Sequence, residues 1–277
     1  MRTPKVLVLG LALGLLAGCG PAVTSAAPTT SASSPARSAP APAAKKPKPP
    51  AVPAHRKPVK SKPVRKPAKH RTARAGGPAD SLMRTGRAGV ALTFDDGPDP
   101  VQTPRLLDLL KKERVKATFC VVGRNVAAYP GLVRRIAAEG HTLCNHTWAH
   151  SLTLGKRRPA AIRADLARTN QAIRRAAPGA KIKYLRAPGG NFTPAFVRVA
   201  RELGMTSIYW QVDPRDWEHP KGETGAAHRA KVVRTVKQHV GRGSIVLSHD
   251  YRQPETITAY ETLLPWLRQR YRLIALP

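Results

Sequence analysis

The chain has 277 residues, of which 48 are Lys or Arg and 16 are Asp or Glu, so its formal net charge is +32. A charge of this size indicates an anionic partner, such as a nucleic acid or an acidic polymer. Beyond the N-terminal segment no apolar run approaches the length of a membrane span, which excludes a polytopic membrane protein. The length allows one large domain or two small ones.

The N-terminal segment has the pattern of an export signal. Residues 4–18 read PKVLVLGLALGLLAG and contain an apolar core that follows the basic Arg2 and Lys5. The signal ends in Leu-Ala-Gly-Cys at positions 16–19, which resembles the lipobox of bacterial lipoproteins. This resemblance implies that residues 1–18 are removed and that Cys19 carries a lipid anchor in the membrane. The alternative is an ordinary signal and a secreted protein.

Residues 19–80 form the next segment, which is rich in Ala, Pro, Ser, Thr and Lys. Because it has almost no large apolar side chains, it cannot bury enough surface to fold, and we expect a disordered tether. Its second half is strongly basic, and the first acidic residue of the chain is Asp80. An exported chain does not meet nucleic acid, so we expect this tether to bind an anionic cell-wall polymer. The alternative is that genome composition explains the basic excess.

From about residue 85 strand-like and helix-like segments alternate, which predicts an α/β domain with a parallel sheet. The predicted strands are 90–94, 117–122, 141–145, 183–186, 206–212, 244–247 and 273–276. The predicted helices are 104–112, 132–139, 160–176, 194–203, 230–240 and 255–270. Two of these helices follow a threonine, Thr103 and Thr193, that supplies a capping hydroxyl before proline. This pattern alone leaves a barrel and an open doubly wound sheet as alternatives.

Polar side chains follow five of the predicted strands, at the point where each strand ends. They are Asp95, Asp96, His146, His150, Arg186, Asp213, Asp216, His249 and Asp250. Because the carboxyl ends of parallel strands lie on one face of the fold, where such folds build their sites, we expect one functional site there. Trp210, within the apolar run IYWQV, is assigned to the core.

Two of these segments point to a metal. His146 and His150 are four residues apart and would lie on one face if the segment coils into a turn. With one aspartate they make a two-histidine, one-carboxylate ligand set for a divalent cation. The neighbouring Asp95 and Asp96 repel each other, and a cation bound to one would allow the other to stay ionised as a base.

Five segments in chain order resemble the motifs of the polysaccharide deacetylases, the carbohydrate esterase family with the NodB-homology domain. The segments are TFDDG at 93–97, HTWAH at 146–150, RAPGG at 186–190, DPRDW at 213–217 and LSH at 247–249. The resemblance covers about residues 85–277. It implies that the fold is a distorted, incomplete (β/α) barrel of about seven parallel strands.

The resemblance also implies a role for each motif residue. Asp95 is the general base and Arg186 holds it in place. His249 is the general acid that protonates the leaving amine, and Asp216 hydrogen-bonds and tunes it. The other implied roles are metal binding by Asp96, His146 and His150, an oxyanion contact from the backbone N–H of Gly189, where many members carry tyrosine, and an acetyl pocket walled by Trp217 and Leu247.

The activity that the resemblance implies is metal-dependent removal of acetyl groups from N-acetylated glycans, with peptidoglycan or a chitin-like oligomer as substrate. Zinc is the expected metal, with cobalt, nickel and iron as alternatives. The alternative functions are O-deacetylation of acetylxylan, non-catalytic wall binding, and an iron-dependent oxygenase, which uses the same ligand set.

The cysteines fit an exported protein. If Cys19 carries lipid, Cys120 and Cys144 remain as an even pair near the ends of two consecutive predicted strands. In an oxidising compartment we expect them to form a disulfide. The alternative is two buried thiols, because free cysteine packs as a small apolar side chain.

Overall fold

The computed structural model describes residues 76–277. The predicted signal peptide 1–18, the lipidation site Cys19 and the predicted tether up to residue 75 lie outside the described residues. Among the described helices, none has the length and apolar character needed to cross a membrane.

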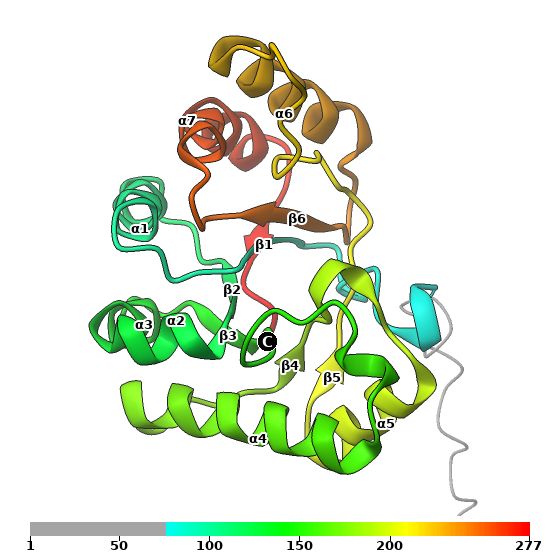
Figure 1. Ribbon diagram of the computed structural model, residues 1–277. Helices are drawn as coiled ribbons and strands as arrows, with labels where there is room; N and C mark the ends of the chain where they lie inside the picture. Colours follow the sequence, from blue (N-terminus) through cyan, green and yellow to red (C-terminus); the bar gives the residue numbers. More distant parts are fainter. Residues whose placement is uncertain (1–75) are drawn as a thin grey trace, which may run out of the picture. The chain divides into compact units, whose positions relative to one another are not determined.

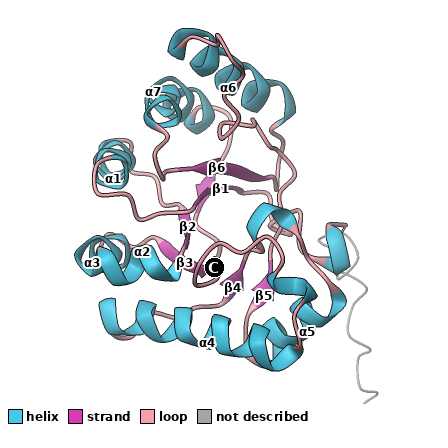
Figure 2. Cartoon of the chain, in the orientation of Figure 1, coloured by secondary structure: helices cyan, strands magenta, loops and turns pink. Residues whose placement is uncertain are grey.

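Seven parallel strands form a single sheet in the order β5-β4-β3-β2-β1-β6, with β7 paired to β1 (Figures 1 and 2). The strands are β1 Val90–Asp95, β2 Thr118–Val121, β3 Thr142–Asn145, β4 Tyr184–Leu185, β5 Thr206–Ser207, β6 Ile245–His249 and β7 Leu273–Ile274. The helices are α1 Gln102–Lys112, α2 Gly123–Ala128, α3 Pro130–Ala138, α4 Pro159–Ala176, α5 Pro194–Glu202, α6 Gly225–His239 and α7 Pro254–Arg268, with short 3-10 helices at Pro78–Asp80, Leu154–Lys156 and Pro188–Gly190.

The sheet curves into an incomplete barrel with helices around its outside (Figure 1), which confirms the predicted fold class. The gap between β5 and β6 is crossed by the chain that follows β5. There Val212 forms an isolated parallel bridge with Val246, and the N–H of Leu247 donates to the carbonyl of Val212 at 2.9 Å. The predicted strand 206–212 is therefore divided: its start pairs with β4 and its end reaches β6.

The folded part begins earlier than residue 85. The N–H of Leu82 donates to the carbonyl of Ser207 at 2.9 Å, and the N–H of Tyr209 donates to the carbonyl of Leu82 at 2.7 Å. The 3-10 helix Pro78–Asp80 also falls within the segment predicted as tether. Leu82 is thus attached to the β5 edge, and Arg84 forms an isolated bridge with Ser244.

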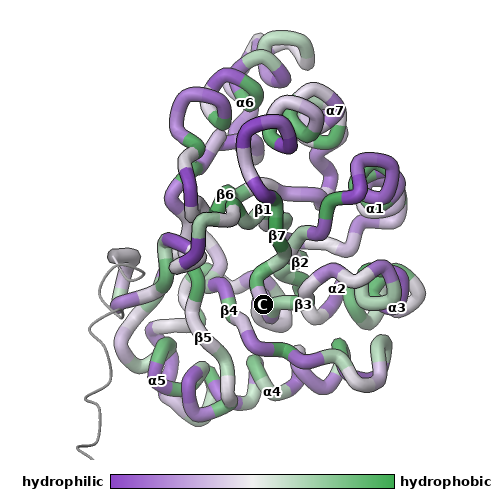
Figure 3. Tube along the Cα trace, turned by 180° about the vertical axis from the view of Figure 1, so that it is seen from behind, coloured by the Kyte–Doolittle hydropathy of each residue, from purple (hydrophilic) through white to green (hydrophobic). Residues whose placement is uncertain are grey.

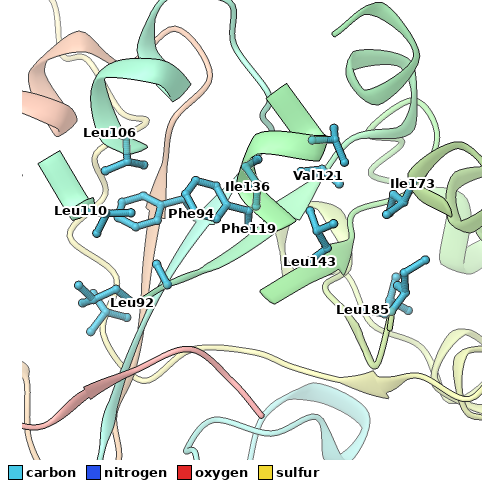
Figure 4. Close-up of a cluster of buried hydrophobic side chains, with 14 of the residues drawn as sticks. Leu92, Phe94, Leu106, Leu110, Phe119, Val121, Ile136, Leu143, Ile173 and Leu185 are labelled. Atoms are coloured by element: carbon cyan, nitrogen blue, oxygen red, sulfur yellow. The ribbon is translucent and has the colours of Figure 1, made fainter. Parts of the chain in front are cut away.

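Alternation along β1 separates the core from the barrel interior. Leu92 and Phe94 point toward the helices, where Phe94 lies 5.6 Å from Phe119 and 4.9 Å from Tyr260 between ring centroids (Figure 4). Hydrophobic residues concentrate along the strands, and hydrophilic ones along the outer sides of the helices (Figure 3). Ala91 belongs instead to the cluster inside the barrel. Since successive strand residues alternate in direction, Asp95 continues the interior face.

Cys120 of β2 and Cys144 of β3 are register partners in adjacent strands. The structure joins them by a disulfide, and both lie fully buried in the cluster inside the barrel. This crosslink ties together the two strands that follow β1 in the sheet.

Helix starts differ in part from the prediction. Thr193 caps α5 as expected, because its hydroxyl accepts the N–H of Phe196 at 3.2 Å. Thr103 does not cap α1, which begins at Gln102; the N–H groups at this start donate instead to Oδ1 of Asp99, at 2.8 and 2.7 Å. Helix α2 was not predicted, since six residues are too few to show a helical period.

Candidate active site

The adjacent carboxylates diverge at the end of β1. Asp95 is the last residue of the strand, and Asp96 adopts a left-handed backbone with φ 74° before the cis peptide bond between Gly97 and Pro98. Aspartate tolerates this conformation better than most residues. The side-chain amide of Asn125 donates to the carbonyl of Asp96 at 2.7 Å and holds the turn. The bend lets both carboxylates reach one cavity.

Arg186, directly after β4, forms a buried ion pair with Asp95. Its Nη1 donates to Oδ1 of Asp95 at 2.7 Å and to Oγ1 of Thr93 at 2.8 Å, and its Nη2 donates to the carbonyl of Tyr209 at 3.1 Å. Both charged side chains are almost completely buried. The pair therefore fixes Oδ1 of Asp95 and leaves Oδ2 without a hydrogen bond from Arg186.

Three side chains converge as a candidate metal site. The Nε2 atoms of His146 and His150 lie 3.2 and 3.1 Å from Oδ1 of Asp96, and the three ligand atoms lie within 4.8 Å of one another. His146 Nδ1 faces the carbonyl of Arg186 at 2.8 Å, so this nitrogen carries a proton and the neutral ring would present the lone pair of Nε2 to a cation. Oδ1 of Asp96 is buried and has no hydrogen-bond partner within residues 76–277. This set of donors fits a divalent cation.

The histidines do not converge through a helical turn, as their spacing suggested. Thr147 has φ 64° and His150 has φ 55°, so both adopt left-handed backbone conformations that a helical turn does not contain. The side-chain oxygen of Asn145 accepts the N–H of Thr147 at 2.8 Å and holds the backbone there. The two imidazole rings end with their centroids 5.0 Å apart.

Asp216 and His249 form a buried pair on the same face. His249 Nδ1 lies 2.8 Å from Oδ1 of Asp216, while the N–H of His249 and the hydroxyl of Thr256 donate to Oδ2 at 2.8 and 2.9 Å. Burial lowers the pKa of His249, but the charge and hydrogen bond of Asp216 outweigh it and raise this pKa to about 10. The imidazole is therefore protonated at neutral pH.

One cavity of about 340 Å³ brings together five of the side chains described above: Asp95, Asp96, His146, His150 and His249. Its other lining residues are Leu152, Ala187, Gly189, Trp210, Asp213, Trp217 and Leu247. Trp217 is 46% exposed at the rim. Gly189 has φ 59°, and a Cβ there would lie 3.1 Å from the side chains of both Leu152 and Asn191, so a larger residue would need a strained backbone and a small shift of these neighbours.

Three of the lining residues were missed or misassigned. Trp210 lines the cavity, although its apolar neighbours suggested a core position; its ring stacks on Tyr209 with a centroid separation of 3.9 Å. Leu152 and Ala187 carry no chemical signal, and their nearness in sequence to His150 and Arg186 was the available clue.

Asp213, which was among the predicted site residues, lines the cavity while its Oδ1 accepts the N–H of Arg215 at 2.7 Å, so it also shapes its own loop.

The sequence model of the polysaccharide deacetylase family matches residues 83–208. The chain is 37% identical to a chitooligosaccharide deacetylase of Bradyrhizobium sp., over 67% of this chain and 87% of that protein. It is 34% identical to a peptidoglycan-N-acetylglucosamine deacetylase of Bacillus cereus, over 69% of this chain and 68% of that protein. The chain belongs to the polysaccharide deacetylase family, and it is a hydrolase.

The solved structures that resemble this chain include an esterase and a pseudoenzyme. A family 4 carbohydrate esterase from Streptomyces lividans in complex with acetate matches with a TM-score of 0.59 and 30% identity, over 68% of this chain and 92% of that chain. A family 4 pseudoenzyme from Bacillus anthracis matches with a TM-score of 0.63 and 28% identity, over 71% of this chain and 67% of that chain. Because both share this fold, the fold alone does not establish turnover, which depends on the residues in the site.

Proposed function

We propose that this hydrolase removes acetyl groups from N-acetylated glycans, with peptidoglycan N-acetylglucosamine or a chitin-like oligomer as substrate. One observation carries the proposal: Asp95, protonated His249 and the three candidate metal ligands face one cavity. The names of the relatives from Bradyrhizobium and Bacillus cereus support N-acetylated glycans as the substrate class.

Asp96, His146 and His150 would hold the cation. Zinc is our choice for these ligands, and cobalt, nickel or iron could use the same set. A cation held there acts as a Lewis acid on the acetyl carbonyl.

Asp95 is proposed as the general base. Arg186 occupies its Oδ1, so Oδ2 is the oxygen that accepts a proton from the attacking water. The buried guanidinium also keeps the carboxylate in one orientation, because moving it would leave an unpaired charge inside the barrel.

His249 is proposed as the general acid. An amide has a poor leaving group, so the departing nitrogen needs a proton, and an imidazole that is protonated at neutral pH can supply it. Asp95 and His249 are register partners on the adjacent strands β1 and β6, which supports their proposed action on one substrate as base and acid. The N–H of Gly189 is the proposed oxyanion donor, and Trp217 and Leu247 are the proposed walls around the acetyl methyl group.

The test is acetate release from a panel of substrates by zinc-loaded protein. We expect acetate from chitin oligomers and from purified peptidoglycan, and none from the Asp95→Asn variant. Release from acetylxylan alone would identify an O-deacetylase, and oxygen uptake with iron would identify an oxygenase. Wall binding that is unchanged by Asp95→Asn, with no acetate from any substrate, would identify a non-catalytic protein.

We further propose that the protein works outside the cytoplasm, anchored by lipid on Cys19, with its basic tether on an anionic wall polymer. The apolar segment before Cys19 and the absence of acids before Asp80 support this, as does a disulfide in the fold. Incorporation of labelled fatty acid should be lost in Cys19→Ala, which should appear in the culture medium. Binding to wall should weaken with salt and after the anionic polymer is extracted.

A further inference from the structure

The loop that carries Asp216 and Trp217 is held by helix α6 at two carbonyl groups. His228 Nε2 donates to the carbonyl of Asp216 at 3.0 Å. Lys231 Nζ donates to the carbonyl of Glu218 at 3.0 Å. These two carbonyls flank Trp217 in the sequence, so the backbone on both sides of this tryptophan is fixed by side chains of one helix.

Glu223 holds both donors in place. Its Oε2 lies 2.7 Å from His228 Nδ1, and its Oε1 lies 3.3 Å from Lys231 Nζ. The hydrogen bond from His228 lowers the pKa of Glu223, so the carboxylate is ionised at neutral pH. His228 is buried, with 2% of its side chain exposed. Glu223, His228 and Lys231 together are called the α6 cluster below.

The loop is also held at the carboxylate of Asp216, which accepts hydrogen bonds from His249 and Thr256. Trp217 is 46% exposed and its ring contacts the guanidinium of Arg215, itself an exposed side chain. Packing therefore does little to fix the indole of Trp217, and its position depends on the neighbouring backbone. This backbone is held by the two carbonyl contacts and by the carboxylate of Asp216. The same hydrogen bond from His228 fixes the backbone of Asp216, whose carboxylate holds His249.

We propose that the α6 cluster is a set of positioning residues that fixes Asp216 and Trp217, and thereby controls both proton delivery by His249 and the width of the acetyl pocket. This inference rests on the proposed deacetylase function for its kinetic consequences. The positioning itself is a property of the loop, and it can be measured without turnover.

A second metal site is the competing explanation, because nitrogen and oxygen atoms of His219, Glu223 and His228 lie within 4.8 Å of one another. The geometry disfavours it. The rings of His219 and His228 are stacked at 4.4 Å with an interplanar angle of 16°, and the lone pairs of nearly parallel rings do not converge on one ion. Both nitrogens of His228 already face oxygen acceptors, and the ammonium of Lys231 already occupies the carboxylate.

The kinetic test compares N-acetyl and N-propionyl chitin oligomers with Glu223→Gln, His228→Gln and Lys231→Met. One methylene in a defined pocket is discriminated by roughly 10–200-fold. We expect kcat/KM for the acetyl substrate to fall about 10-fold or more, and the preference for acetyl over propionyl to fall severalfold. The alkaline limb of the pH profile should also move, because His249 loses its fixed partner. Glu261→Gln and His239→Gln, at exposed positions on α7 and α6, are the matched controls and should keep the wild-type ratio.

A loss of folded protein would lower both rates equally and leave their ratio unchanged, so an unchanged ratio and pH profile in all three variants would overturn the proposal. Hydrogen exchange of peptides covering 214–222 gives a readout without turnover. We expect faster exchange there in Glu223→Gln and wild-type exchange in β1. If the wild type releases no acetate but exchange of 214–222 is faster in Glu223→Gln, the proposed function fails and the positioning role stands. Exchange in Glu223→Gln equal to that in the wild type would contradict the positioning role. A second equivalent of zinc per chain that Glu223→Gln removes would also contradict it.

Discussion

Asp216 holds His249 at two points, since its Oδ2 accepts the backbone N–H and its Oδ1 lies 2.8 Å from Nδ1. The first contact places the residue and the second fixes the ring, so that Nδ1 faces the carboxylate and Nε2 is directed away from it. The same carboxylate raises the pKa of the imidazole, to about 10, against the effect of burial. One buried aspartate therefore sets both the orientation and the protonation state of the proposed acid.

Replacing Asp216 by Asn should reduce kcat by about 100-fold, a typical contribution of general acid catalysis. The neutral amide removes the negative charge that raises the pKa of His249, so the imidazole loses its proton at a lower pH. The alkaline limb of the kcat profile should therefore move to lower pH. Profiles of wild type, Asp216→Asn and the exposed control Glu261→Gln would show this; an alkaline limb that stays in place in Asp216→Asn would mean that His249 is not the acid.

Replacing Arg186 by Met should destabilise the protein by about 3–5 kcal/mol, because it leaves the carboxylate of Asp95 buried without its partner. The control is Arg163→Ala, since Arg163 and Glu202 form an ion pair with both side chains nearly half exposed. This exposed pair should be worth at most about 1 kcal/mol. Urea unfolding measures both changes, and equal losses would contradict the assignment of Arg186 as the buried partner of the base.

Asp250 should give the protein an unusual dependence of stability on pH. Burial, together with the charges of Asp96 and Asp99, raises its pKa to about 7, although the hydrogen bond from Thr103 opposes this. The folded state then binds a proton that the unfolded state has released, so this residue's contribution to stability falls as the pH rises from about 4 to about 7.

The measurement is the free energy of unfolding of wild type and Asp250→Asn across this range in chelator-treated protein. Asparagine cannot ionise, so the wild type should lose stability relative to the variant as the pH rises. A difference between the two proteins that does not vary with pH would show that Asp250 titrates normally.

The disulfide between Cys120 and Cys144 closes a loop with a sequence separation of 24. Crosslinks of this length typically stabilise a fold by about 3 kcal/mol. Reductant should lower the melting temperature of the wild type and leave that of Cys120→Ala/Cys144→Ala unchanged. Equal melting temperatures of the wild type with and without reductant would contradict a stabilising bridge.

The fold class could be predicted from the sequence because the strands are short apolar runs separated by amphipathic helices, as in 90–94 and 160–176. The division of the fifth strand was not predictable, since residues 206–212 read as one continuous strand. Only their partners reveal that Thr206 pairs with β4 while Val212 reaches β6. The start of α1 was missed because Asp99, outside the apolar period, supplies the first acceptors.

In the candidate site, the charged and histidine residues could be predicted from their type and spacing. The apolar residues that line the cavity between them could not. Trp210 illustrates the limit: an apolar run predicts burial, but its ring forms a wall of the cavity beside Tyr209. His228 shows another limit, because it lies just before the predicted helix 230–240 and carries no local signal that its ring reaches the carbonyl of Asp216, twelve residues earlier. Such contacts depend on how the loop returns to the helix.

The most direct test asks whether Asp95 and Asp96 have different roles, as base and as metal ligand. It measures metal content and acetate release in Asp95→Asn and Asp96→Asn. Because Asp96 belongs to the candidate ligand set and Asp95 is held by Arg186, Asp95→Asn should bind about one zinc per chain, like wild type, and release no acetate from chitin oligomers. Asp96→Asn should lose both the metal and the activity. An active Asp95→Asn protein, or one that has lost its zinc while Asp96→Asn keeps it, would contradict the account.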